Sequence, residues 1–318
     1  MSKIETGDPA GEGSIPFVKM HGAGNDFVIF DARTRPLSFS SEVCAAIADR
    51  RRGIGCDQVI ILREASAADV WMQIFNADGS ESGACGNATR CVAWLLDAER
   101  EKNPALTPRP DAKVSIETAG GLLTAWKVGP YEASATPKAP TGGAEPLRLV
   151  ESEASPLMAV DMGLPKRDWQ DIPLAWPQDT DEVDLRVGPL ANPVAVNMGN
   201  PHVVFFVDPA AAIDLAKWGA EVETNALFPE RVNVSVAEVV SPKSIRLRVW
   251  ERGAGLTQAC GTAACATYVA ARERKLVADE VAIQLPGGKL VLSQDINGRI
   301  IMTGPIAFAY EGRVVLQD

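Results

Sequence analysis

The tripeptide Ala-Cys-Gly occurs twice in this sequence, around Cys85 and around Cys260. The two cysteines are 175 positions apart (260 minus 85), and the same offset superimposes further polar residues without a gap. Self-similarity at a fixed offset is typical of a duplicated folding unit. The sequence therefore predicts two halves with the same fold. The coinciding pairs are Asn25 with Asn200, Gln58 with Asn233, Asn76 with Glu251, and Asn87 with Thr262.

The boundary between the halves is predicted from composition. Residues 131–146 read YEASATPKAPTGGAEP, and such Pro-, Gly-, Ala- and Ser-rich stretches form loops or linkers. We expect a flexible N-terminal extension over 1–15, a first repeat over 16–140 and a second repeat over 147–305. The acidic, proline-rich stretch at 151–187 matches no motif that we can name.

Apolar runs of strand length recur in both halves, with Gly, Pro and Asp between them. Two longer segments, 87–102 and 262–275, have helical periodicity, and the second is apolar nearly all round, as in a helix buried within a domain. The predicted fold class is α+β: two pseudo-symmetric repeats, each a β-sheet or barrel around a central helix. Strands are expected at 27–32, 57–62, 70–75, 113–119, 202–207, 233–240 and 245–250.

Charge and hydropathy exclude several classes of partner. The net charge of −10 argues against a binder of nucleic acid or of anionic membranes, because both need a basic surface. No apolar run approaches the roughly 18 residues of a membrane helix. The first sixteen residues lack the apolar core of a secretory signal, so we expect a cytoplasmic protein.

The cysteines fall into two groups. None of the six forms a C-x-x-C pair, and with only two histidines, His21 and His202, we expect no metal site. In the cytoplasm all six should be reduced thiols. We expect packing roles for four of them and chemistry for the repeated pair. The four are Cys44, Cys56, Cys91 and Cys265.

The repeated cysteines are each expected just upstream of a helix. Asn87 and Thr262 are both favoured N-cap residues. Free backbone N–H groups and the helix dipole at such a position stabilise an anion, so they can lower the pKa of a thiol and hold a substrate carboxylate. Two such thiols related by approximate two-fold symmetry could remove a proton from one face of a carbon and return one to the other. That chemistry inverts a stereocentre. No pyridoxal-type lysine motif is evident, although a lysine outside any motif stays possible.

Six motifs, in order, resemble those of the diaminopimelate epimerase family. They are MHGAGNDFVIFD, RRGIGCDQ, FNADGSESGACGNATR, MGNPH, RVNV and ERGAGLTQACGTAACA, and they span about residues 16–310. The resemblance implies an isomerase without cofactor that interconverts LL- and meso-2,6-diaminopimelate on the route to lysine and peptidoglycan. It also implies a site in the cleft between the halves and a last strand, within 306–318, that returns to the first half. We further expect a homodimer.

The resemblance assigns roles position by position. Cys85 and Cys260 would be the paired acid/base groups, and Arg252 and Glu251 would hold the distal carboxylate and ammonium. His202 and Glu251 would tune the thiols, although a purely structural role for His202 stays open. The family usually has glycine at positions 88 and 263, where this chain has Ala88 and Ala263, and often an acid where Leu256 stands. Substrate contacts are expected from Asn25, Gln58, Asn76, Gly86, Asn87, Asn200, Asn233, Glu251, Arg252, Gly261 and Thr262.

Two other functions are compatible with part of this pattern. A proline or hydroxyproline racemase would also use two cysteines, but its substrate has no second amino-acid head for Arg252 and Glu251 to hold. An amino-acid-binding protein without activity would not need both cysteines. Solvent deuterium exchange at the substrate α-carbon distinguishes an enzyme from such a binding protein.

Overall fold

The computed structural model describes residues 14–102, 112–128 and 156–315. The predicted linker at 131–146 and most of the predicted extension lie outside these ranges. The predicted extension, 1–15, is one residue too long, because strand β1 already begins at Ile15, whose side chain is buried.

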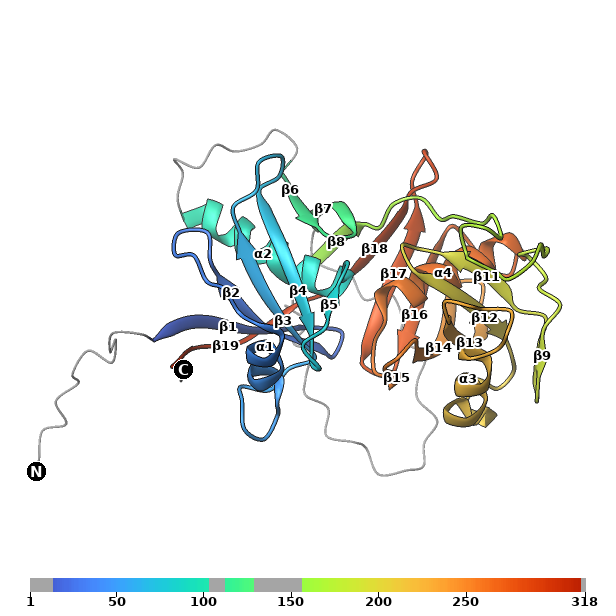
Figure 1. Ribbon diagram of the computed structural model, residues 1–318. Helices are drawn as coiled ribbons and strands as arrows, with labels where there is room; N and C mark the ends of the chain where they lie inside the picture. Colours follow the sequence, from blue (N-terminus) through green and yellow to red (C-terminus); the bar gives the residue numbers. More distant parts are fainter. Residues whose placement is uncertain (1–13, 103–111, 129–155, 316–318) are drawn as a thin grey trace, which may run out of the picture.

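The chain forms two lobes, each with one helix enclosed by strands (Figure 1). All seven predicted strands and both predicted helices are present. The first lobe contains β1 (Ile15–Gly22), β2 (Asn25–Asp31), α1 (Ser41–Ala48), β3 (Gln58–Arg63), β4 (Val70–Asn76), β5 (Glu81–Ser82), α2 (Gly86–Lys102), β6 (Lys113–Thr118) and β7 (Gly121–Val128). After β8 (Leu157–Asp161), the second lobe contains β9 (Arg186–Val187), β10 (Leu190–Ala191), β11 (Val194–Asn197), β12 (Pro201–Phe206), η1 (Ala210–Ala212), α3 (Leu215–Glu223), β13 (Asn233–Ser241), β14 (Ser244–Glu251), β15 (Gly255–Thr257), α4 (Gly261–Glu273), β16 (Glu280–Leu285), β17 (Gly288–Gln294) and β18 (Ile300–Pro305), and β19 (Ala307–Val314) follows.

The strand registers repeat at the offset found in the sequence. Phe27 pairs with Gln58 across the parallel strands β2 and β3, and His202 pairs with Asn233 across the parallel strands β12 and β13. Both pairs differ by the same 175 positions. The parallel pairing of β4 with β6 likewise recurs in that of β14 with β16. The internal repeat is therefore a repeat of topology and register as well as of sequence.

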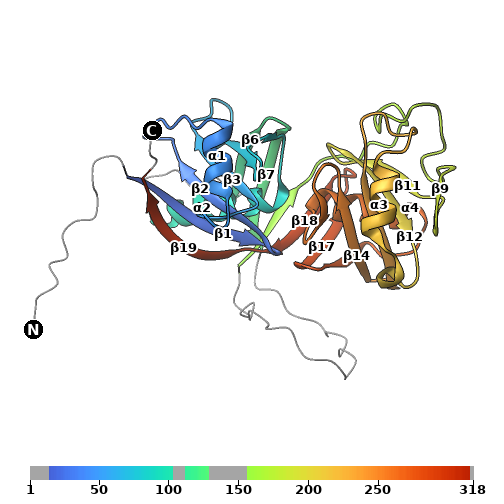
Figure 2. The ribbon, with the colours of Figure 1, turned by 60° about the horizontal axis from the view of Figure 1, so that its bottom comes forward.

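One continuous sheet of 17 strands joins the lobes. Strand β8 pairs with β7 of the first lobe and with β18 of the second. Strand β19 then runs antiparallel to β1, so the end of the described chain lies in the first lobe (Figure 2).

The core of each lobe lies around its enclosed helix. Helix α2 buries its apolar face, including Cys91, Val92 and Leu96, among the strands of the first lobe. Helix α4 is buried nearly all round because many of its residues are small, with alanine the most frequent, and strands approach it from several sides. Helices α1 and α3 cover the other face of their sheets with two further apolar clusters. This arrangement leaves the N-termini of α2 and α4 at the junction of the lobes.

Candidate active site

Each repeated cysteine lies directly at a helix start. Cys260 is the N-cap of α4, with an extended backbone at φ −132° and ψ 111°, and its carbonyl accepts from the amide of Ala264 at 3.1 Å. The carbonyl of Cys85 accepts from Thr89 at 2.9 Å in the same way. The N-cap prediction for Asn87 and Thr262 was wrong. Both are the second residue within their helix, since the cysteine carbonyls already accept the first helical hydrogen bonds.

The two helix starts face each other at close range. A Cβ at Gly86 would lie 2.5 Å from Cε of Met302, and a Cβ at Gly261 would lie 3.1 Å from Sδ of the same methionine. The second position would also be 3.8 Å from Oδ1 of Asn87. Glycine at both positions therefore lets backbone amides from the two lobes approach one small region, where they can hold a carboxylate.

Amide side chains surround the Cys85 thiol. Its Sγ lies 3.6 Å from Oδ1 of Asn25, which also accepts from Nδ2 of Asn87 at 3.3 Å. Nδ2 of Asn25 in turn donates to Asp57 at 3.0 Å, and Arg50 donates to the other carboxylate oxygen of Asp57 at 2.8 Å. Three of the predicted site residues are thus joined in one network with an ion pair behind it.

A carboxylate lies beside the Cys260 thiol. Sγ of Cys260 is 3.5 Å from Oγ1 of Thr262, and Glu251 is its other hydrogen-bonding neighbour. Glu251 accepts from Thr257 at 2.5 Å. Burial raises the pKa of Glu251, while its hydrogen bonds with Thr257 and Cys260 lower it.

The remaining predicted residues form three pairs. Nε2 of Gln58 donates to Asn76 at 3.0 Å, and Nε2 of His202 lies 2.8 Å from Oδ1 of Asn200. Oδ1 of Asn233 accepts the backbone amide of Arg252 at 3.0 Å. Nη1 of Arg252 donates to the carbonyl of Glu230 at 2.9 Å, so one edge of the guanidinium is tied to the fold.

Electrostatic contacts cross the junction of the lobes. The charge of Glu251, in the second lobe, raises the pKa of Cys85 in the first, and the charge of Asp57 raises the pKa of Glu251. The two cysteine neighbourhoods therefore affect each other's proton affinities across the junction.

The expected lowering of the thiol pKa is not found. Burial raises the pKa of Cys85 to about 11, and hydrogen bonds from the amides of Ala88 and Asn87 only partly offset it. Burial and the charge of Glu251 raise the pKa of Cys260 well above its usual value. The helix start does favour the thiolate, but the loss of hydration on burial outweighs it.

His202 is a neutral imidazole. It is fully buried, and burial together with the charge of Arg252 lowers its pKa to about 3. Any influence of His202 on the thiols must therefore come from its hydrogen bond to Asn200 rather than from a positive charge.

Sequence reasoning missed four residues at the site. Asp57 and Thr257 orient predicted residues, and Met302 separates the two helix starts. Arg90 donates to Oδ1 of Asn87 at 2.8 Å. Asp57, Thr257 and Arg90 all lie within the quoted motifs, and that position is the feature of the sequence that could have indicated a role at the site. Nothing in the sequence pointed to Met302.

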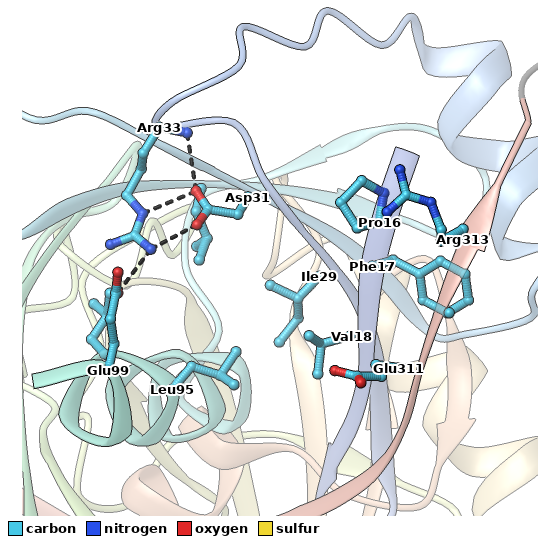
Figure 3. A pocket seen from close by; sticks show the side chains of 13 residues that line it. Pro16, Phe17, Val18, Ile29, Asp31, Arg33, Leu95, Glu99, Glu311 and Arg313 are labelled. Atoms are coloured by element: carbon cyan, nitrogen blue, oxygen red, sulfur yellow. Dashed lines mark hydrogen bonds and ion pairs between the residues drawn. The ribbon is translucent and has the colours of Figure 1, made fainter. Parts of the chain in front are cut away.

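A hollow in the first lobe lies elsewhere (Figure 3). It is bounded by β1, β19 and the C-terminal part of α2, and no predicted site residue lines it. Arg33 pairs there with Asp31 at 2.7 Å and with Glu99 at 2.9 Å. Arg33 is therefore already paired with two carboxylates in this hollow.

The described ranges contain no group of three or more His, Cys, Asp or Glu side chains that could hold a metal ion. Within the same ranges, no helix is long and apolar enough to cross a membrane.

Comparison with known proteins gives one family. The diaminopimelate epimerase family model matches residues 17–130 and 194–309. The diaminopimelate epimerase of Acidiphilium cryptum is 46% identical over 94% of this chain and 96% of its own length, and that of Rhodospirillum centenum is 46% identical over 94% and 91%. Among solved structures, a Bacillus anthracis phenazine biosynthesis protein has a TM-score of 0.61 at 16% identity, covering 95% of this chain and 99% of its own. A hydroxyproline epimerase from Agrobacterium vitis has a TM-score of 0.60 at 13% identity, covering 96% and 94%. These two likenesses concern the fold alone.

Proposed function

The chain belongs to the diaminopimelate epimerase family, and from that premise we propose which of its residues carry the reaction. The enzyme interconverts LL- and meso-2,6-diaminopimelate without a cofactor, an activity that follows from the family and from relatives of near-equal length. This reaction supplies lysine and peptidoglycan precursors. The predicted fold and activity are thereby confirmed, and the amino-acid-binding alternative is disfavoured.

Cys85 and Cys260 are the two acid/base groups. One thiolate sulfur takes the α-proton from one face of the substrate carbon, and the thiol of the other cysteine gives its proton to the opposite face. The C–H bond that breaks leaves its electron pair on the α-carbon and the attached carboxylate. Amides at the starts of α2 and α4 hold that carboxylate, through Gly86, Asn87, Gly261 and Thr262, where a developing negative charge is stabilised.

The distal head of the substrate is held by the second lobe. Arg252 binds its carboxylate and Glu251 its ammonium, while Asn25, Gln58, Asn76, Asn200 and Asn233 supply further hydrogen bonds. The fixed edge of Arg252, tied to Glu230, supports this assignment because it orients the planar guanidinium in advance. A proline-like substrate offers nothing for this pair to bind.

Two residues adjust the site without contacting the reacting carbon. Glu251 also raises the proton affinity of the neighbouring thiols, and neutral His202 orients Asn200.

Several wider properties belong to the same proposal. The two repeats comprise 15–140 with 306–318, and 147–305, after an N-terminal extension. The enzyme acts in the cytoplasm as a homodimer. In support, all six cysteines are free thiols, and the exposed Phe308 and Tyr310 on β19 offer a dimer an apolar surface to bury.

The observation that carries the assignment is the pair of cysteines at facing helix starts. The test incubates the protein with LL-diaminopimelate, L-proline and trans-4-hydroxy-L-proline in separate reactions and resolves the stereoisomers by chiral chromatography. Only diaminopimelate should reach an equilibrium mixture of LL and meso forms. Comparable inversion of proline would refute the assignment of the distal site.

A further inference from the structure

Arg90 is a buried charge that the proton transfer itself does not use. It lies one turn into α2 and has no solvent exposure. Its Nη2 donates to Oδ1 of Asn87 at 2.8 Å, whereas Nε and Nη1 have no hydrogen-bond partner within the described ranges. A cation without hydration is costly to bury, which indicates that its position serves a function.

The guanidinium lies between elements of both lobes. A Cβ at Gly22 of β1 would come within 3.2 Å of Nη2, and a Cβ at Gly304 of β18 within 3.1 Å of Cζ. The charge of Arg90 also acts on Cys85 in the first lobe and on Cys265 of α4 in the second. Two glycines therefore leave room for a fixed positive charge behind both helix starts.

A chain of hydrogen bonds leads from Arg90 to a thiol. Arg90 donates to Oδ1 of Asn87, and Nδ2 of Asn87 donates to Oδ1 of Asn25, the atom 3.6 Å from Sγ of Cys85. With its oxygen bound to Arg90, the Asn87 amide must present its nitrogen to Asn25. Asn25 is thus oriented from two sides: Asp57 accepts from its Nδ2, and the Asn87 amide, which Arg90 fixes, donates to its Oδ1.

The two thiols also face different charges. Besides burial, which raises the pKa of both thiols, Arg90 lowers and Glu251 raises the pKa of Cys85, whereas the charge of Glu251 raises the pKa of Cys260. Cys91 and Cys265, the other two thiols on which Arg90 acts, are enclosed in the apolar cores. Arg90 accordingly favours the ionised form of Cys85 over that of Cys260.

We propose that Arg90 is a positioning residue of the epimerase reaction: through Asn87 and Asn25 it orients the Cys85 thiol, and its buried guanidinium, linked by this chain to Cys85, supports the thiolate of Cys85 more than that of Cys260. The proposal rests on the proposed function in that Cys85 is one of the two bases. It assigns to Arg90 no contact with the reacting carbon.

The test measures alkylation by iodoacetamide across pH, without substrate, with Cys85 and Cys260 peptides quantified by mass spectrometry. The pH at which a cysteine is alkylated at half its maximal rate reports the pKa of that thiol. How accessible the thiol is to the reagent changes only the maximal rate. In the wild type, Cys85 should have the lower midpoint. Arg90→Met should raise the Cys85 midpoint by about one unit, so that roughly tenfold less thiolate reacts at a given pH, and should move Cys260 less.

Arg90→Lys separates orientation from charge. It keeps the positive charge but lacks the planar fork, so the Cys85 midpoint should stay near that of the wild type while kcat falls at nearly constant KM. Arg100→Met, on the same helix near its C-terminus, is the matched control and should change neither quantity. A folded Arg90→Met enzyme with an unchanged Cys85 midpoint and unchanged kcat would overturn the proposal.

A gentler variant covers the case in which Arg90→Met does not fold. Gly22→Ala keeps the Arg90 side chain but displaces its Nη2 by a few tenths of an ångström, so kcat should fall and the Cys85 midpoint should shift. If Gly22→Ala had the kcat and the Cys85 midpoint of the wild type, the proposal would be contradicted. The alkylation midpoints of Cys85 and Cys260 are measured without turnover. A wild-type enzyme inactive on diaminopimelate would therefore contradict the proposed function, while the alkylation midpoints would still test the role of Arg90.

Discussion

Gly86 and Gly261, the first residues of α2 and α4, both meet the side chain of Met302. Met302 belongs to β18, the strand that β8 links to the first lobe, and it has no solvent exposure. One buried methionine thus sets the separation of two helix starts that come from different repeats. The chemistry depends on that separation, because a single carboxylate must reach amides from both.

Gly86→Ala should destabilise the protein. Its Cβ would lie 2.5 Å from Met302 and 3.0 Å from Sδ of Met162, and overpacking of a core of this kind costs about 1–3 kcal/mol. Urea unfolding measures the loss. Gly83→Ala is the control, since a Cβ there would meet nothing closer than 3.7 Å. Equal stability of the two variants would mean that the helix starts lie further apart than described.

Cys85→Ala and Cys260→Ala should each lower kcat by about 10²- to 10⁴-fold, because each removes one positioned proton-transfer group. Cys91→Ala and Cys265→Ala are matched controls on the same two helices, at buried positions that pack in the core. These controls should lose stability and keep most of their turnover. If Cys85→Ala or Cys260→Ala kept more than about a tenth of wild-type turnover, the two-base mechanism would be rejected.

Arg252→Lys should impair only substrates that carry a distal head. It keeps the charge but not the planar fork, and the loss of one charge-assisted hydrogen bond costs about 1.5–3 kcal/mol, roughly ten- to more than a hundredfold in kcat/KM. Slow exchange of a short monoamino acid should fall much less. Arg231→Lys, which alters an exposed arginine paired with Glu223, serves as the control. Equal losses for long and short substrates would show that Arg252 supports the fold instead.

His202 should make the folded protein sensitive to acid. Its pKa is about 3 in the folded state against 6.5 in the unfolded state, so the unfolded chain binds a proton that the folded chain does not. Stability should therefore fall as the pH drops from about 6.5 toward 3, by up to about 1.4 kcal/mol per pH unit from this group. His202→Gln should reduce that slope, as measured by urea unfolding at several pH values. Parallel curves for wild type and variant would contradict the assignment of a neutral buried histidine.

The repeat explains why much of the fold could be predicted. A constant offset aligned Gln58 with Asn233 and Cys85 with Cys260, and the strand registers preserve that alignment. The helices followed from periodicity because both have a long apolar surface. The cap positions did not follow, since Asn87 and Thr262 have the right residue type but the carbonyl of the cysteine two residues earlier already accepts the first helical hydrogen bond.

Electrostatics at the site could not be predicted because it depends on burial. A helix start lowers the pKa of an exposed thiol, but the sequence does not say how completely two lobes will enclose it. For the same reason the neutral state of His202 and the buried charge of Arg90 required the structure. Residues that act at a distance in sequence, such as Met302, leave no local pattern.

The most direct test of the account follows the substrate proton in deuterium oxide. LL-diaminopimelate is incubated with the wild-type enzyme, and mass spectrometry of the separated stereoisomers is performed during the first few per cent of turnover. With two bases, the proton removed stays on one cysteine while the other delivers deuterium, so the meso product should carry one deuterium and the recovered LL substrate almost none. Equal labelling of substrate and product from the start would show that one base serves both faces, and would contradict the paired roles of Cys85 and Cys260.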